Sequence, residues 1–162
     1  MAIRKFLCAA LLVGGPCLHA HAGMADLING VTVGSQLPFV DLHYLGAVPT
    51  LEEHLVLIDF WATWCEPCRT SIPALNTLQA RFAAKGLVVV GVSPESAEVV
   101  LPFLKTVPMQ YASAIDGSPG LHKSLHIKAL PYAVFVSRSG RIIWRGQPAE
   151  IDDALVDTLL AR

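Results

Sequence analysis

A pair of cysteines, Cys65 and Cys68, is separated by only two residues in the middle of the chain. Two sulfurs at this spacing can close a disulfide in a short ring and exchange two electrons with another disulfide. An apolar run ends just before the pair and a helical pattern begins at it, which places Cys65 at a helix N-terminus. The unpaired N–H groups and the dipole at such a terminus favour thiolate over thiol. We therefore expect Cys65 to be the exposed, attacking sulfur and Cys68 to resolve the mixed disulfide that forms.

The two residues between the cysteines bear on this chemistry in different ways. Pro67 suits the first turn of a helix, where a missing N–H costs nothing. Glu66 places a negative charge beside the sulfurs, which opposes thiolate formation and should make the pair more reducing.

Three other uses of the pair are open. A structural disulfide is one, although so short a loop contributes little stabilisation by loop closure. A zinc site is another, but it needs four ligands, and the nearest candidates are His122 and His126 at i,i+4 spacing. A fold that has lost its redox activity is the third. We expect redox activity, with no cofactor and no resident metal.

The elements that must position the cysteines follow an α/β pattern. Short apolar runs rich in β-formers predict strands, and apolar residues at three- and four-residue spacing predict helices. The expected strands cover 55–61, 87–92, 132–136 and 141–145. The expected helices cover 65–85, 97–106, 120–126 and 151–160. With a segment of short strands over 31–49, this order predicts a mixed central sheet with helices on both faces and an N-terminal β extension.

The first 22 residues have the layout of a secretory signal peptide. Arg4 and Lys5 precede an apolar stretch over 6–18, and small residues allow cleavage after Ala22. This stretch is shorter than the roughly 20 residues that a membrane-spanning helix needs. We expect a signal peptide over 1–22 and one domain over 23–162 that works in the periplasm. An uncleaved N-terminal anchor is the alternative.

Charge and cysteine count agree with this division. The 12 basic and 13 acidic residues give a net charge of −1, which argues against a strongly basic nucleic-acid binder. Cleavage would remove Arg4 and Lys5 and leave 10 basic against 13 acidic residues, a net charge of −3. It would also remove Cys8 and Cys17. In an oxidising compartment, the two remaining cysteines can pair only with each other or with a partner protein.

The run 57–69 closely resembles the active site of the thioredoxin superfamily. The chain over 33–162 resembles the secreted thioredoxin-like thiol-disulfide oxidoreductases of the TlpA/ResA type. Other motifs that carry the resemblance lie at 34–39, 90–93, 129–131 and 139–141. The resemblance implies a thioredoxin fold and an enzyme that exchanges disulfides with protein substrates, which we expect to be a reductant. Its electrons would come from a membrane thiol-disulfide donor.

The resemblance also implies roles for residues around the pair. Pro131 would be a cis-proline that faces the cysteines, because a cis bond before proline costs little and fixes a turn. It would leave the backbone of Leu130 free to pair with an extended substrate. Trp61 and Trp64 would flank the site. The expected substrate contacts are Trp64, Glu66, Pro67 and Leu130.

Asp59 matches a buried acid that lies beneath the redox pair in thioredoxins. A carboxyl on an apolar strand should have a raised pKa, and it could take the proton from Cys68 during resolution. Many ResA-like members have Asn at this position and a Glu three residues after the second cysteine, where this chain has Ser71. The acid is therefore expected at Asp59. This departure weakens the inference that this chain shares ResA's activity, the reduction of apocytochrome c. A part in cytochrome c maturation therefore stays open.

Two other functions are alternatives. A copper-handling or other metal-binding protein would use the dithiol with a histidine or Met109 as ligands. A peroxidase-like enzyme is the other, but its attacking cysteine would need Thr or Pro just before it, where this chain has Trp64.

Overall fold

The computed structural model describes residues 31–38, 40–116 and 120–162. The expected signal segment over 1–22 lies outside these residues, as does Phe39 in one of the motifs that carry the resemblance. Among the residues described, no helix is both long and apolar enough to cross a membrane.

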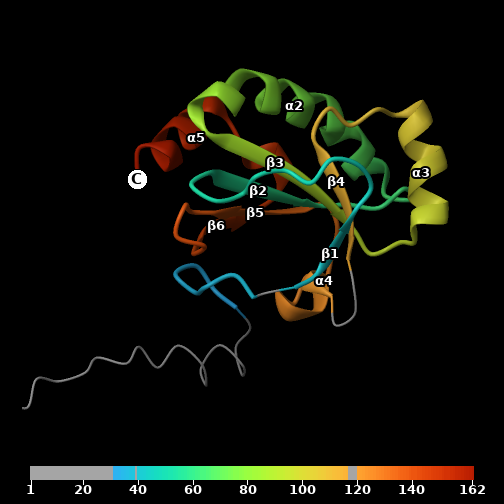
Figure 1. Cartoon of the computed structure of the whole chain (residues 1–162), viewed down its shortest axis with the longest axis horizontal. Helices are drawn as coiled ribbons and strands as arrows, with labels where there is room; N and C mark the ends of the chain where they lie inside the picture. The colour runs from blue at the N-terminus through green and yellow to red at the C-terminus, as the bar shows by residue number, and fades with distance from the viewer. Residues whose placement is uncertain (1–30, 39, 117–119) are drawn as a thin grey trace, which may run out of the picture.

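Six strands form one mixed sheet in the order β1-β4-β3-β2-β5-β6 (Figure 1). They are β1 (Leu42–Tyr44), β2 (Leu55–Phe60), β3 (Leu87–Ser93), β4 (Ala112–Asp116), β5 (Tyr132–Val136) and β6 (Ile142–Gly146). β3 pairs in parallel with β2 and β4, whereas β1 runs antiparallel to β4 and β5 runs antiparallel to both β2 and β6. The expectation of a mixed sheet is confirmed.

Helices lie on both faces of this sheet, as expected. They are α2 (Glu66–Phe82), α3 (Ala97–Thr106), α4 (Leu121–Ser124) and α5 (Asp153–Leu160), with 3₁₀ turns at Ala83–Lys85 and Pro148–Glu150. α2 and α5 cover one face and pack on a cluster of β2, β3 and β5 side chains, while α4 lies across the other face (Figure 1). α3 adds Val100 to a third cluster, which holds Trp61 and both cysteines.

The apolar spacing of α2 explains its position on the sheet. Its buried side chains, Ile72, Leu75, Leu78 and Phe82, follow Cys68 at the three- and four-residue steps that make one helical face. The 3₁₀ turn that follows ends at Gly86, whose φ of 96° suits a residue without a Cβ. The helix therefore runs away from the cysteines along the sheet, and its first turn lies at the carboxyl end of β2.

Strand β4 was not expected from the sequence. It consists of Ala, Ser, Ala, Ile and Asp, and three of these five residues are of types depleted in strands, Ala and Asp. It forms because it pairs with β3 on one side and with β1 on the other. Tertiary pairing thus outweighs weak local propensity here, and the omission of this strand from the expected order is a correction.

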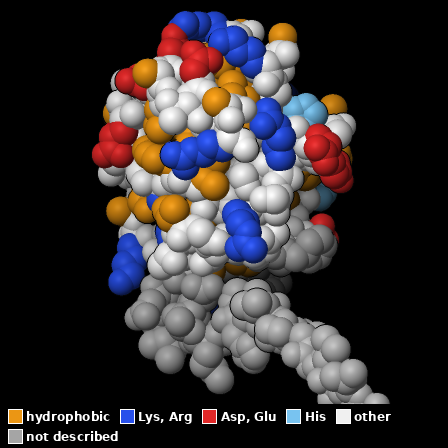
Figure 2. All heavy atoms as spheres, turned by 90° about the vertical axis from the view of Figure 1, so that its left-hand side faces the viewer, with side chains coloured by type: hydrophobic (Ala, Val, Ile, Leu, Met, Phe, Trp, Pro, Cys, Tyr) orange, Lys and Arg blue, Asp and Glu red, His pale blue; other side chains and the backbone are white. Residues whose placement is uncertain are grey.

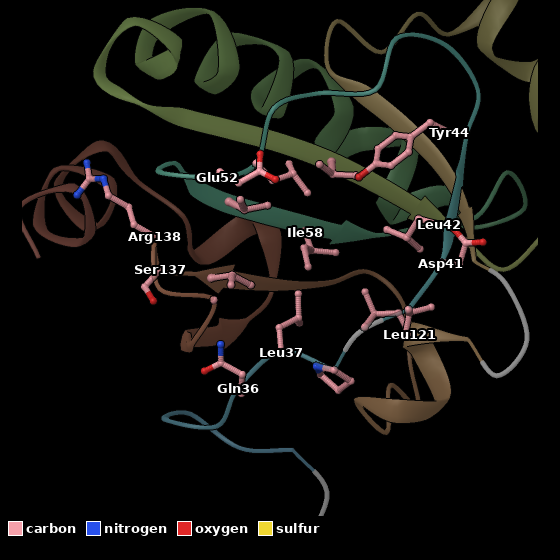
Figure 3. Close-up of a pocket in the computed structure, with 17 residues that line it drawn as sticks. Gln36, Leu37, Asp41, Leu42, Tyr44, Glu52, Ile58, Leu121, Ser137 and Arg138 are labelled. Carbon is pink, nitrogen blue, oxygen red and sulfur yellow. The ribbon is translucent and has the colours of Figure 1, made fainter. Parts of the chain in front are cut away.

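The N-terminal extension crosses the sheet on the face away from α2. At one edge Gln36 forms a bridge with Arg141, and at the other edge β1 pairs with β4. Between the extension, β2 and α4 lies a hollow of about 480 Å³. Figure 3 shows Leu37, Ile58 and Leu121 lining it from these three elements. The cysteines do not line this hollow.

Ion pairs on the surface join α5 to the end of α2 and to the 3₁₀ turn that follows it. Arg81 pairs with Asp153, and Lys85 pairs with Asp157 at 2.8 Å, all four side chains being exposed. On the face seen in Figure 2, basic and acidic side chains are interspersed with hydrophobic ones. This face therefore carries no continuous basic field of the kind that binds nucleic acid.

Candidate active site

The two cysteines form a disulfide at the first turn of α2. Cys65 and Cys68 are joined by an S–S bond of 1.99 Å with their Cα atoms 5.3 Å apart. Cys65 is the N-cap of the helix, and its Sγ accepts a hydrogen bond from the Cys68 N–H at 3.3 Å. When the bond is reduced, the same N–H and the helix dipole are placed to stabilise a thiolate on Cys65.

The expected exposure of the first sulfur is wrong for this oxidised state. Cys65 is 4% exposed and Cys68 is 1% exposed, so both are buried. The physical reason is the cap position, which folds the Cys65 side chain back over the first turn. There it packs in one cluster with Trp61, Val100 and the second cysteine.

The residues around the pair differ sharply in exposure. Trp61 is fully buried beneath the pair, whereas Trp64, directly before it, is 70% exposed. Glu66 also points to solvent and pairs with Arg69 at 3.0 Å. Since the Arg69 guanidinium offsets part of the charge of Glu66, the effect of Glu66 on the sulfurs is smaller than its sequence position alone suggests.

The loop that enters β5 approaches the start of α2. The peptide bond between Leu130 and Pro131 is cis. Pro131 and Pro67 line the same hollow of about 420 Å³, which also includes Pro148 and Ala149 from the turn before α5. Leu130 packs against the cluster that contains both cysteines. The structure thus brings together the residues expected to contact substrate on this side of the pair.

Asp59 is buried within the sheet, with 1% of its surface exposed. Leu57, two residues earlier on β2, packs in one cluster with Leu75 and Leu78 of α2. Because side chains alternate along a strand, Asp59 lies on this same face and nearer to the first turn of α2. Burial raises the pKa of Asp59 to about 7, against the opposing effect of a hydrogen bond from Tyr111.

Ser71 does not replace the acid that is absent from its position. Its hydroxyl donates to the backbone carbonyls of Pro67 and Cys68, at 2.9 and 3.1 Å. It therefore serves the helix, while the carboxyl group of the site is that of Asp59.

Tyr111 is a residue of the site that sequence reasoning missed. Its hydroxyl donates to Oδ2 of Asp59 at 3.3 Å from a position just before β4. The sequence carries no spacing signal for this contact, because it depends on the pairing of β4, the strand that was not expected.

Glu95 is a second missed residue, and it holds the loop before the cysteines. Its carboxylate accepts from the Thr63 N–H at 2.6 Å and from the Thr63 hydroxyl at 2.7 Å. The register of the parallel pair explains the contact, since Phe60 lies opposite Val92 and both residues lie three positions further on. Knowing that β2 and β3 are neighbours would have indicated this pair.

Replacing Glu95 with alanine is expected to destabilise the protein by about 1–3 kcal/mol, because two donors of Thr63 lose a charged acceptor in a partly buried place. Urea unfolding of the oxidised protein measures this effect. Glu52→Ala is the matched control, since Glu52 is an exposed glutamate. Equal unfolding midpoints for the two variants would contradict the proposal that Glu95 stabilises the loop before the cysteines.

Of the residues considered as metal ligands, His122 is engaged elsewhere, whereas Met109 packs near the disulfide. His122 Nδ1 lies 2.6 Å from Oδ2 of Asp116, and its ring packs edge-on against Phe60. His126 is exposed, and Met109 packs against two apolar clusters, one of which holds both cysteines. Over the ranges that the structure covers, no three His, Cys, Asp or Glu residues gather where they could hold a metal ion.

Comparison with solved structures places this arrangement in the thioredoxin-like fold. A crystal structure from Chlorobium tepidum, assigned as the thiol:disulfide interchange protein DsbE, superposes with a TM-score of 0.70 and 30% identity. That match covers 81% of this chain and 97% of the other. A structure assigned as a thiol-disulfide oxidoreductase from Bacteroides vulgatus gives a TM-score of 0.71 at 22% identity, over 80% of this chain and 97% of the other. The expected thioredoxin fold is confirmed.

Sequence relatives agree with the fold. The chain is 34% identical over 151 residues to the thioredoxin-like protein YneN of Bacillus subtilis. That match covers 86% of this chain and 88% of the relative. It is 26% identical over 89 residues to the thiol-disulfide oxidoreductase ResA of Bacillus thuringiensis, over 54% of this chain. The match covers 51% of that ResA, so the chain spans about half the length of this relative. The family model described as Redoxin matches residues 45–160, which include both cysteines, and the chain therefore belongs to this family.

Proposed function

We propose that this protein is a thiol-disulfide oxidoreductase that reduces disulfides of exported proteins through the Cys65-Glu66-Pro67-Cys68 pair. The observation that supports this best is the disulfide at the N-cap of α2, in one cluster with Leu130 of the cis-proline loop. Relatives named as thiol-disulfide oxidoreductases add support.

The reaction begins with the reduced protein. The thiolate of Cys65 attacks one sulfur of a substrate disulfide, forms a mixed disulfide and releases the other substrate sulfur as a thiolate. Cys68 then loses its proton to the carboxylate of Asp59 and attacks the Sγ of Cys65. The substrate leaves with both sulfurs reduced, and the protein is left with the Cys65–Cys68 disulfide seen in the structure.

The substrate is an extended protein segment that lies across the cis-proline loop. The backbone of Leu130 pairs with this segment, and the hollow between Pro67 and Pro131 receives a side chain next to the substrate cysteine. Trp64, which is 70% exposed, provides a large apolar surface on the rim at a low entropic cost. Glu66, exposed beside it, contacts the polar edge of the segment.

The site of action is the periplasm, reached through a signal peptide over 1–22, or a tethered position if that segment is not cleaved. Each turnover leaves the cysteines oxidised, so the protein needs a reductant. A membrane thiol-disulfide carrier supplies the electrons, because no soluble reductant pool is available in that compartment. Disulfides of exported proteins, with those of cytochrome c maturation among them, are the substrates.

Insulin reduction and the reduction potential of the pair test this proposal together. The purified protein should accelerate insulin reduction by dithiothreitol, and its potential should lie near that of thioredoxin, about −270 mV. The double variant Cys65→Ser/Cys68→Ser is the control and should have no effect. A potential near that of DsbA, about −120 mV, would contradict the reductant role and indicate an oxidant.

A further inference from the structure

The carboxyl group of Asp59 has two oxygens in unlike surroundings. Oδ2 accepts the hydrogen bond from the Tyr111 hydroxyl at 3.3 Å. Oδ1 is buried and has no hydrogen-bond partner among the residues that the structure describes. A buried polar atom without a partner carries a free-energy cost, so an oxygen left in this state calls for an explanation.

The surroundings of Asp59 are shaped to admit the Tyr111 ring. Gly91 lies opposite Asp59 in the register of β2 and β3. A Cβ on Gly91 would lie 2.8 Å from Cε of Met109, 3.0 Å from Nε1 of Trp61 and 3.2 Å from Cε2 of Tyr111. A glycine is thus required for these three side chains to close around this point of the sheet.

Tyr111 also lies between Asp59 and the solvent. It is 8% exposed and lines a surface hollow of about 550 Å³ together with Met109 and Ser113. Asp59 does not line this hollow. The Tyr111 side chain therefore connects the buried carboxyl group with a surface that water can reach.

We propose that Tyr111 is a positioning residue for proton transfer: its hydroxyl holds Oδ2 of Asp59 and leaves Oδ1 to accept the proton of Cys68. The inference rests on the proposed function and assigns a role to a residue outside the cysteine motif. Because Tyr111 fixes one oxygen, the carboxyl plane cannot turn freely.

Among the groups packed around Asp59, Tyr111 is the one whose side chain donates a hydrogen bond to the carboxyl group. Gly91 on β3 and Ala133 on β5 stand opposite it in the sheet, and neither titrates. Trp61 follows two residues after Asp59 and packs in one cluster with both cysteines. In the oxidised protein the disulfide does not titrate, and the hydrogen bond from Tyr111 favours the ionised form of Asp59.

Tyr111→Phe removes the hydroxyl and keeps the ring. The first measurement is a ¹³C NMR titration of the Asp59 carboxyl in the oxidised protein, with the signal assigned by Asp59→Asn. The midpoint should rise by about 0.5–1 pH unit, which is the size expected from one lost hydrogen bond. Tyr44→Phe is the control and should leave the midpoint unchanged, since Tyr44 lies in β1.

The second measurement is the rate at which a mixed disulfide on Cys65 is resolved, followed against pH by stopped flow. Its half-maximal pH should rise in Tyr111→Phe by the same amount as the titration midpoint. A midpoint that does not move would overturn the Tyr111–Asp59 coupling, and a shifted midpoint with an unshifted rate profile would overturn its part in proton transfer. A wild-type protein that reduces no disulfide would instead overturn the proposed function, which the titration of the oxidised protein does not need.

Discussion

Replacing Cys68 with serine is expected to leave substrates covalently attached to Cys65. The attacking sulfur and its place at the N-cap of α2 remain, so the mixed disulfide still forms. The resolving sulfur is absent, and the intermediate persists. Serine is nearly the same size and can keep the position at 1% exposure filled. Non-reducing electrophoresis of extracts from cells that express the variant should show adducts of higher mass that dithiothreitol removes.

Cys65→Ser is the matched variant, because it makes the same replacement of sulfur by oxygen at the other cysteine of the pair. It should reduce insulin at least about a thousand-fold more slowly than the wild type and should trap no adducts, since the nucleophile itself is lost. If both variants formed adducts equally, the order of attack and resolution would be wrong. A Cys68→Ser variant that turned over at the normal rate would contradict the mechanism altogether.

The regular core of the fold could be predicted because local pattern and tertiary environment agree there. The apolar runs of β2, β3 and β5 are buried, and the helix that begins after Cys65 presents its apolar spacing to them. In β4, by contrast, residues of low β-propensity are held in the sheet by their neighbours, and propensity alone gives no indication of such a strand.

The candidate site divides in the same way. The cysteine motif and the carboxyl of Asp59 are visible in the sequence because they interrupt or follow an apolar strand. Tyr111 reaches the site through the pairing of β4 with β3, and Glu95 through the pairing of β3 with β2, so no local pattern marks either residue. The burial of Cys65 is likewise a tertiary effect, since it depends on Trp61 and Val100 closing around the disulfide.

Replacing Asp59 with asparagine should stabilise the oxidised protein above pH 7 and slow its reaction. Burial raises the pKa of Asp59 to about 7 in the folded protein, while an unfolded aspartate has a pKa of about 3.9. Between these values the folded state binds a proton that the unfolded state does not. The stability that this group contributes is therefore complete below about pH 4 and is lost as the pH rises through about 7.

Asparagine has nearly the same shape, keeps an oxygen that can accept from Tyr111, and has no charge to bury. A difference of about three pKa units corresponds to at most about 4 kcal/mol, so Asp59→Asn should exceed the wild type by on the order of 2–4 kcal/mol at pH 8.5. The two proteins should converge near pH 4. Urea unfolding at several pH values measures the difference, with Asp41→Asn, a change at an exposed aspartate, as control.

The same variant should lose activity where it gains stability. Without the carboxylate, Cys68 has no buried base, and resolution of the mixed disulfide should slow by about 10²–10⁴-fold. Attack by Cys65 should change little, because it depends on the N-terminus of α2. Stopped-flow measurement of the two steps separates these effects. If stability followed pH in parallel in both proteins, Asp59 would not hold the proton. If the mixed disulfide were resolved at the wild-type rate, the base would lie elsewhere. A gain in stability without a loss of rate would then show that Asp59 is a buried carboxyl group with no catalytic role.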